Sequence, residues 1–510
     1  MKNHAMQLLL PALTGLLLAA SFPQFNQGYL AWVAFIPLLL FVFRAKSVAQ
    51  ALAGGFLAGI LQLFPLLIWM PTVLAGYGGL PEALAWIAYS LTVAMLACYP
   101  AAVCAAVKLL MKRCGESRIL LFPLVWMVSE YAQSISPFGG FPWLLAGYSQ
   151  SGWLGLIQVA DLAGVYGISF LVVFVNTAAA WPYLRKARRP AVWAPLAGAG
   201  IMVLGCLAYG EMSLRHWGKF KPAFQAAMLQ GNLDIDEDPQ VLMDKFQRGY
   251  VRMADSLGPP APDLLVLPES PSPVSFENDP AYREMLESLA KRYSLGLVFN
   301  NISYRVVQGR ERYFNSAYFL DAKGNLAGVY DKIHLVPFGE YIPLKKMFSF
   351  VETISKDVGS FAPGRDYRIV PIGQHFANAI ICYEAAFPGL VRRFVREGSR
   401  LIVNLTNDRW YGNSSAPYQH LAIARWRAIE NRRYLLRAAN SGITAVIEPT
   451  GKIQSSTGIL QEAVCRGGFV FIADQTPYTR YGDAFIFLCA IIIVLAAMAG
   501  IRGSAKNIGT

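Results

Sequence analysis

The chain has 510 residues, of which 55% are hydrophobic and only 15% charged, and its formal net charge is +13. Its mean hydropathy of +0.38 is too high for an ordinary soluble enzyme and is typical of a polytopic membrane protein with one soluble insert. The positive charge would suit a nucleic-acid-binding protein. However, the sequence has no basic stripe with interleaved aromatic residues, so nucleic acid is not expected as a partner.

Eight apolar runs approach or exceed the length of about 20 residues that a bilayer-crossing helix needs. They cover residues 7–21, 27–43, 50–75, 83–111, 119–135, 161–184, 191–210 and 483–501. The first run follows a lysine and ends in small residues, as a signal peptide does. Because a second run follows almost at once, we expect a retained helical hairpin instead. The sequence therefore predicts an α-helical membrane domain of eight spans, seven in residues 1–212 and the last in residues 481–510.

Lysine and arginine residues lie in alternate connections between these runs. They are Lys2, Arg44, Lys46, Lys108, Lys112, Arg113, Arg118, Arg185, Lys186, Arg188, Arg189, Arg502 and Lys506. The connections near 21–26, 76–82 and 136–161 contain neither residue type. Under the positive-inside rule, both termini are predicted to be cytoplasmic and residues 213–480 to lie on the outer side. In a bacterium this would be the periplasmic side of the inner membrane.

Within residues 213–480, short apolar runs alternate with amphipathic stretches. Strands are predicted at 223–229, 263–268, 295–300, 315–320, 326–330, 376–382, 401–405, 443–448 and 468–473, and helices at 240–257, 280–293, 388–398 and 415–438. Continuous apolar strands separated by helices indicate an α/β layered domain with buried sheets. A block of about 250 residues is large enough for one sizeable core.

Three reactive side chains stand at the ends of apolar runs in this block. They are Glu269 in LLVLPES, Lys332 in VYDKIHLVPFGEY and Cys382 in AIICYEAAF. A thiol of ordinary pKa is mostly protonated at neutral pH, so a nucleophilic cysteine needs a base or a nearby cation. Glu269 would serve as the base, and Lys332 would stabilise the thiolate and an oxyanion. Glu340 is a second carboxylate that could orient the lysine or share the proton.

Each of these residues alone also has an ordinary structural interpretation. Glu269 could cap a turn, Lys332 could lie on the surface, and Cys382 could pack in the core or form a disulfide with Cys465. The remaining five cysteines lie in or beside apolar runs, so no disulfide framework is expected. The three motifs together favour catalysis. His334, beside the lysine, has no metal-ligand spacing around it, so packing is the better interpretation and no metal is expected.

Further candidates follow the nucleophile and a later strand. Tyr383 and Glu384 could shape the oxyanion site, although packing explains Tyr383 equally well. Asn407 and Asp408 could line the pocket, and turn formation explains them almost as well. Trp410 suits the water–lipid interface, because aromatic residues with a polar group favour that region.

The segment 341–361 mixes two lysines with Met347, Phe348, Phe350 and Val351. This composition is typical of a membrane-dipping arm or lid. A structural loop that covers the core is nearly as good an interpretation, and the sequence leaves both open.

The motifs LPES, YDKIHLVPFGEY and IICYE resemble the Glu, Lys and Cys motifs of the nitrilase superfamily. Together with TNDRWYG, and with their position between seven spans and a final one, they make the whole chain resemble the apolipoprotein N-acyltransferase family. This resemblance implies a four-layer α-β-β-α sandwich, a Glu269–Lys332–Cys382 triad assisted by Glu340, Tyr383 and Glu384, and an extracytoplasmic active site that faces the membrane. The segment QGNLDIDEDPQVL lacks a tryptophan that the family often carries there.

The resemblance also implies a reaction. Cys382 would take an acyl chain from a phospholipid, which the resemblance implies is phosphatidylethanolamine, and pass it to the α-amine of a diacylglyceryl-modified N-terminal cysteine of an apolipoprotein. Such transfer through a thioester predicts ping-pong kinetics, and it needs no cofactor; a monomer is expected.

Two other functions remain open from the sequence. One is a membrane-tethered nitrilase-type amidohydrolase, in which water accepts the acyl group, and the other is a transporter or scaffold with an inactive outer domain. An acyl donor dissolved in the bilayer would explain the spans, which favours transfer over hydrolysis. The few charges within the spans argue against an ion path.

Overall fold

The computed structural model describes residues 2–76, 78–185, 189–234, 238–270, 272–341 and 361–506. The chain divides into two compact units. The helical unit comprises residues 1–71, 82–214 and 481–510, and the α/β unit comprises residues 72–81 and 215–480.

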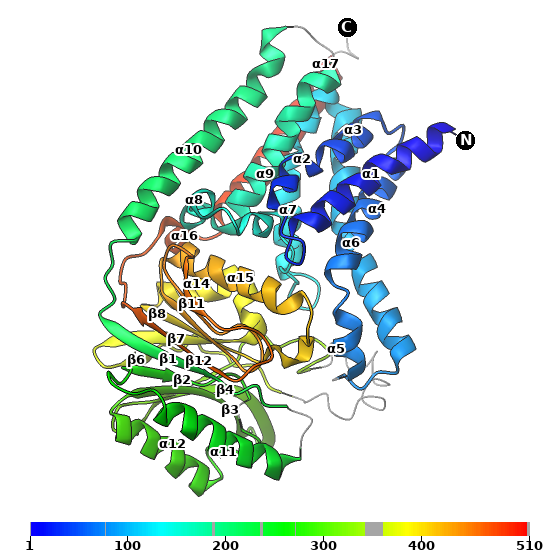
Figure 1. Cartoon of the computed structure of the whole chain (residues 1–510). Coiled ribbons are helices and arrows are strands. Elements are labelled where there is room, and N and C mark those ends of the chain that lie inside the picture. The colour runs from blue at the N-terminus through cyan, green and yellow to red at the C-terminus, as the bar shows by residue number, and fades with distance from the viewer. Residues whose placement is uncertain are drawn as a thin grey trace. The chain divides into compact units, whose positions relative to one another are not determined.

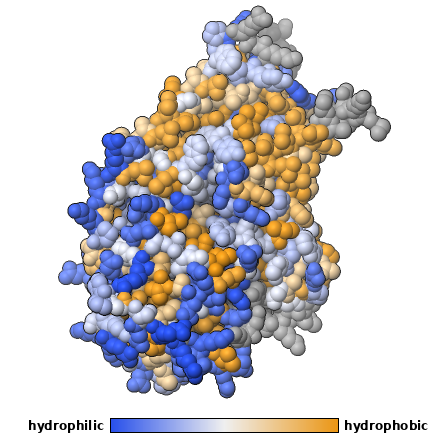
Figure 2. Space-filling view, in the orientation of Figure 1, coloured by the Kyte–Doolittle hydropathy of each residue, from blue (hydrophilic) through white to orange (hydrophobic). Residues whose placement is uncertain are grey.

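The helical unit contains a helix within each of the eight apolar runs. Its helices are α1 (Lys2–Ser21), α2 (Ala31–Ala34), α3 (Ile36–Arg44), α4 (Val48–Leu66), α5 (Met70–Gly76), α6 (Glu82–Cys114), α7 (Phe122–Ile135), α8 (Leu154–Ile157), α9 (Ala160–Arg185), α10 (Ala194–Trp217) and α17 (Ala484–Lys506), with α5 and α10 reaching into the second unit. Hydrophobic side chains dominate much of this unit's surface (Figure 2), which is the composition that a lipid environment favours.

Four helical segments are long and apolar enough to cross a membrane: Val48–Leu66, Glu82–Cys114, Ala160–Arg185 and Pro190–Trp217. Shorter apolar helices cover Leu8–Ser21, Gly28–Arg44 and Ala484–Gly500. The prediction of eight spans is thus supported only in part. The run 119–135 becomes α7, which has 14 residues and is about 21 Å long, against about 30 Å of hydrocarbon. The run 27–43 is divided among a 3₁₀ turn, α2 and α3.

The α/β unit is built on two six-stranded sheets, with the strand orders β12-β1-β2-β3-β4-β5 and β11-β10-β9-β8-β7-β6. The strands of the first sheet are β1 (Phe224–Gln230), β2 (Leu264–Val266), β3 (Gly296–Val307), β4 (Arg310–Leu320), β5 (Leu326–Asp331) and β12 (Ala463–Phe469). Those of the second are β6 (Val370–Ile372), β7 (His375–Ile381), β8 (Leu401–Thr406), β9 (Leu435–Ala439), β10 (Ala445–Ile447) and β11 (Ile453–Ser456). In each sheet the three central strands are parallel, β1-β2-β3 and β7-β8-β9.

Helices cover the outer faces of the two sheets. They are α11 (Pro239–Asp255), α12 (Pro280–Tyr293), α14 (Pro388–Arg396) and α15 (Ala416–Asn431), followed by the short α16 (Pro477–Tyr481). In Figure 1, α11 and α12 lie below the first sheet, and α14 and α15 lie on the opposite side of the second. β1 contacts β9, and β10 contacts β12, so the sheets face each other. This is the α-β-β-α layering that the family resemblance implies.

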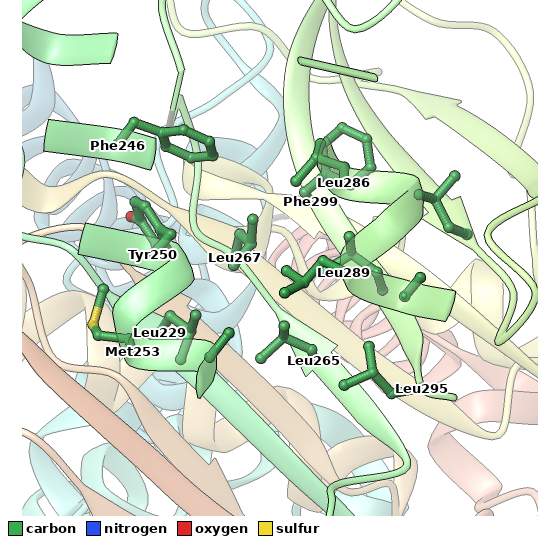
Figure 3. Close-up of a cluster of buried hydrophobic side chains, with 14 of the residues drawn as sticks. Leu229, Phe246, Tyr250, Met253, Leu265, Leu267, Leu286, Leu289, Leu295 and Phe299 are labelled. Carbon is green, nitrogen blue, oxygen red and sulfur yellow. The ribbon is translucent and has the colours of Figure 1, made fainter. Parts of the chain in front are cut away.

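One apolar core joins the first sheet to its helices (Figure 3). Its buried side chains come from β1, β2, β3, α11 and α12, and include Leu229, Phe246, Leu265, Leu286 and Phe299. Burying each such side chain contributes about 1.5–3 kcal/mol. The core therefore fixes β2, whose carboxyl end leads directly to Glu269.

Each predicted strand overlaps an observed one, but the structure has three more. β6, β9 and β11 were not predicted, and the predicted helix 415–438 is too long. α15 ends at Asn431 because Arg432 takes a left-handed conformation with φ +50° as its C-cap. The chain then enters β9 at Leu435.

Candidate active site

Glu269 lies three residues beyond β2 and is buried, with 5% of its surface exposed. Its Oε2 accepts a hydrogen bond of 3.0 Å from the Asn407 backbone N–H, and its Oε1 accepts one of 2.9 Å from Asn315 Nδ2. Burial raises the pKa of Glu269, while the nearby Lys332 cation opposes that rise. These contacts hold the carboxyl group in one orientation, and the upward direction of its pKa shift favours proton acceptance by a general base.

Lys332 follows β5 and is 1% exposed. Its Nζ lies 2.8 Å from Glu340 Oε1 and 3.7 Å from Glu269 Oε1. Burial by itself lowers the pKa of Lys332, but the carboxylates of Glu340 and Glu269 outweigh burial and raise it. The lysine is therefore a fixed cation between two carboxylates, an arrangement that suits the electrostatic role expected of it from the sequence.

Asn315 on β4 connects these charged groups, although it was not among the residues predicted from the sequence. Its Nδ2 donates to Glu269 Oε1 and to Glu340 Oε1, both at 2.9 Å. Its backbone C=O accepts a bond of 2.8 Å from the Lys332 N–H. Its only signal in the sequence was its place as the first of two polar residues that begin the predicted strand 315–320.

Cys382 begins a 3₁₀ turn (Cys382–Ala386) directly after β7 and is 5% exposed. Its φ of +50° is in the left-handed region, which is uncommon for a residue with a Cβ atom and recurs at functional sites. Burial raises the pKa of the Cys382 thiol, the Glu269 carboxylate raises it further, and Lys332 opposes the rise. The resting thiol is thus protonated and needs a base when it attacks.

A buried network behind the thiol holds the backbone of Cys382. His420 Nε2 lies 3.1 Å from the Cys382 carbonyl oxygen, which can only accept, so this nitrogen carries a proton. The other ring nitrogen lies 3.0 Å from Asp408 Oδ1 and 3.1 Å from Arg437 Nη2. Asp408 Oδ2 accepts from Arg437 at 2.7 Å. Thr406 hydrogen-bonds both the Cys382 thiol and Asp408.

This network changes the interpretation of Asp408. Burial alone would raise its pKa, but Arg437 and His420 lower it to about 2. Asp408 is therefore an ionised partner inside the protein, whereas the sequence placed it as a candidate pocket-lining residue. His420 and Arg437 were missed, because a histidine and an arginine within predicted helical sequence give no sign of where they point.

Glu384 joins the nucleophile turn to the lysine loop. Its Oε1 accepts hydrogen bonds from Tyr330 Oη at 2.7 Å, from Ile333 N at 2.8 Å and from His334 N at 3.0 Å. Its Oε2 accepts one of 2.8 Å from Ile381 N. Glu384 is fully buried, and both of its oxygens are used within the protein. These contacts favour a role in positioning the turn over the predicted role in shaping the oxyanion site.

The remaining candidates lie around the same turn. Tyr383 is 6% exposed, and its ring centroid lies 4.9 Å from that of Phe387. His334 lies 3.6 Å from Phe387 by the same measure, in the packing arrangement expected for it. Asn407 is fully buried, and within the described residues its Nδ2 has no hydrogen-bond partner. Trp410 lies half-buried in the 3₁₀ turn Asp408–Tyr411.

Other sequence predictions fall beside or outside the described structure. Cys382 and Cys465 are both free thiols, so the alternative of a disulfide between them does not hold. Most of the predicted arm, residues 342–360, and residues 235–237 of the segment without the tryptophan lie outside the described residues. Among the residues that are described, no group of three or more His, Cys, Asp or Glu side chains is placed to hold a metal ion.

Known proteins resemble the chain over both of its units. Residues 14–178 match the family model of the apolipoprotein N-acyltransferase N-terminal domain, and residues 225–467 match the carbon-nitrogen hydrolase model. An amidase from Nesterenkonia sp. AN1 is 20% identical with a TM-score of 0.38, covering 52% of this chain and 98% of its own.

Curated relatives match nearly end to end. The apolipoprotein N-acyltransferase of Geobacter metallireducens is 40% identical over 97% of this chain and 96% of its own length. The apolipoprotein N-acyltransferase of Methylococcus capsulatus is 32% identical over 99% of this chain and 98% of its own length. From this identity and coverage, together with the two family models matched in succession, the chain belongs to the apolipoprotein N-acyltransferase family.

Proposed function

We propose that this protein transfers a fatty acyl chain from a phospholipid to the α-amine of the diacylglyceryl cysteine at the N-terminus of apolipoproteins. The observation that carries the proposal is the buried group of Glu269, Lys332 and Cys382 in a chain whose helical half matches the N-acyltransferase model. Phosphatidylethanolamine is the proposed donor, and the protein is proposed to act as a monomer.

In the first half-reaction, Glu269 takes the thiol proton and Cys382 sulfur attacks the ester carbonyl of the phospholipid. Lys332 and a backbone N–H beside Cys382 stabilise the oxyanion. The ester bond breaks, Glu269 returns the proton to the leaving alcohol, and lysophospholipid departs. A thioester on Cys382 remains. The pKa directions support this division of roles, because burial raises the pKa of the thiol and Lys332 opposes the rise.

In the second half-reaction, the acceptor amine attacks the thioester carbonyl and gives its proton to Glu269. The C–S bond breaks, and the thiol is regenerated when the proton returns to sulfur. Glu340 holds Lys332 in place at 2.8 Å. Asn407 offers a buried amide donor, unpaired within the described residues, to the substrate side, while Tyr383 and Trp410 supply aromatic surface for the acyl chain. No cofactor takes part.

The membrane topology is part of the proposal. Eight spans, with both termini in the cytoplasm and residues 213–480 in the periplasm, fit the alternation of lysine and arginine along the sequence. The four long apolar helices support a membrane location. The inner membrane would then hold the acyl donor and the active site on the side where lipoproteins mature.

Intact-protein mass spectrometry after incubation with phospholipid tests the function. An acyl-sized adduct that is absent in Cys382→Ala and moves to a diacylglyceryl lipopeptide is the expected result. Loss of the adduct to water at the same rate with and without lipopeptide would indicate an amidohydrolase. A folded, membrane-inserted protein that forms no adduct would overturn the proposal.

A further inference from the structure

A groove runs beside the outer part of β3, on the side where β2 has ended. β2 pairs with β3 only as far as Val298, whereas β3 and β4 continue together as a hairpin to Val307 and Arg310. The groove has a volume of about 470 Å³. It is lined on one side by the hairpin and on the other by residues 272–275 and Asn278, in the segment that follows Glu269. The groove therefore occupies the place that a longer β2 would fill.

Backbone groups of β3 point into this place. The Val298 C=O accepts from Leu267 N across the β2–β3 pair, and Tyr304 N reaches Glu277 Oε2 at 3.4 Å on the same side. Because backbone direction alternates along a strand, the N–H and C=O of Ile302 face the groove as well. Past Val298, no strand within the described residues pairs with this edge of β3.

The β3–β4 register connects the wall of the groove to the buried carboxylates. Ile302 lies directly opposite Asn315 in the β3–β4 register, and Asn315 donates to Glu269. Opposite residues in an antiparallel pair point to the same face. Tyr304 and Tyr313 form the next opposite pair on this face. The apolar and aromatic wall of the groove is therefore the outward extension of the surface that holds Glu269.

An unpaired strand edge beside a row of exposed apolar side chains is the arrangement by which sheets bind an extended polypeptide as an added strand. Ile302 and Tyr313 are 47% and 48% exposed, so they are accessible to such a ligand. We propose that this groove binds the N-terminal segment of the acceptor protein as an added strand, parallel to β3. The inference rests on the proposed function, because it assigns a site to the second substrate of that reaction.

The direction of the added strand follows from the chemistry. The reacting group of the acceptor is its N-terminal amine, which must reach Glu269 at the end of β2. From there the chain continues outward beside β3, in the direction in which β3 itself runs beyond Val298. Recognition through the backbone accepts many side-chain sequences, so acceptors that differ beyond their N-terminal cysteine could use the same groove.

Acceptor length and backbone methylation test the proposal on the full-length enzyme with a preformed acyl-enzyme. The probes are diacylglyceryl-cysteine amide, the same compound with five further residues, and versions of the longer one N-methylated at successive positions. The longer acceptor should have a KM lower by about tenfold. Loss of a single hydrogen bond on N-methylation should raise that KM by about three- to tenfold, at alternate positions only.

Two variants and a matched control complete the test. Ile302→Pro removes an N–H that faces the groove and leaves the bonds to β4 intact, and Tyr313→Ala removes part of the wall. Both should raise KM for the long acceptor alone, with acyl-enzyme formation and the short acceptor unchanged. Leu326→Ala, which shortens a side chain that is 52% exposed on β5, should change none of these values. If Ile302→Pro fails to fold, Tyr313→Ala and the methylation series remain.

The outcomes separate this inference from the proposed function. Equal KM values for long and short acceptors, or tolerance of N-methylation at every position, would overturn the groove assignment while transfer itself persists. Absence of an acyl-enzyme, or of transfer to either acceptor by the wild-type enzyme, would instead overturn the proposed function.

Discussion

Replacing Lys332 with methionine removes a buried cation while keeping most of the side-chain volume. In the wild-type site, burial raises the pKa of Glu269 and the Lys332 charge opposes that rise. Without the cation, the carboxyls of Glu269 and Glu340 remain together, so the pKa of Glu269 rises further. The base is then protonated over a wider range of pH, and the acidic limb of the acylation rate profile should move to higher pH.

The size of the effect follows from the geometry. Lys332 Nζ lies 3.7 Å from Glu269 Oε1, and two unit charges at that distance interact by about 4 kcal/mol at an effective dielectric constant of about 20. If the loss of that interaction raises the activation free energy of acylation by the same amount, the acylation rate at neutral pH falls by about 10³-fold. The variant should still fold, because methionine fills the space of the lysine stem.

Single-turnover acylation by phospholipid can be followed by intact-protein mass spectrometry between pH 5 and 9. This experiment measures both the acylation rate and the position of the acidic limb of its pH profile. Glu340→Gln is the paired variant, since the Glu340 charge raises the pKa of Glu269 and its removal should move the same limb to lower pH. Acylation of Lys332→Met within tenfold of wild type, with an unmoved limb, would refute the electrostatic role of the lysine.

Three further predictions concern the residues that support the site. Glu384→Gln replaces an accepting oxygen with an amide that cannot serve all of its four donors, and should lower the free energy of unfolding by about 2 kcal/mol in denaturant titrations. His420→Gln keeps an N–H for the Cys382 carbonyl and should retain most acylation, whereas His420→Ala should lower the rate about tenfold with the donor KM unchanged; equal rates would contradict a positioning role. Asp408, with its pKa lowered to about 2, stabilises the fold fully above its unfolded pKa of about 3.9 and loses that contribution as pH falls through about 2. The Tm of the wild-type protein should therefore fall more steeply below pH 4 than the Tm of Asp408→Asn. Parallel falls in the two Tm values would contradict the ionised state assigned to Asp408.

The sequence was sufficient to select the residues that we propose to be reactive, because each one interrupts an apolar run where a buried strand ends. Glu269, Lys332 and Cys382 could be identified in this way, and the alternation of strands and helices predicted the layered α/β unit. Strand β9 could not be predicted, because the boundary of α15 depends on one left-handed residue, Arg432, within a continuous amphipathic pattern.

The supporting residues could not be found from local sequence, because their roles come from contacts across the fold. Asn315 meets a carboxylate 46 positions away, and His420 meets a carbonyl 38 positions away. Glu384 was expected to shape the oxyanion site, since its position beside Cys382 does not indicate where its carboxylate points. The number of membrane spans could not be predicted fully for a different reason. Hydropathy shows how apolar a run is, but it does not show where the helix within that run begins, breaks or ends.

Glu384 also has a consequence for how such enzymes can diversify. By binding Ile381 N on one side and Ile333 N and His334 N on the other, one carboxylate sets the separation between the thiol and the lysine from behind. The spacing between the thiol and the lysine is thus set by contacts within the protein and does not depend on the surface that faces the substrates. Rebuilding the approach surfaces would exchange one acyl acceptor for another while the same three reactive groups stay in register.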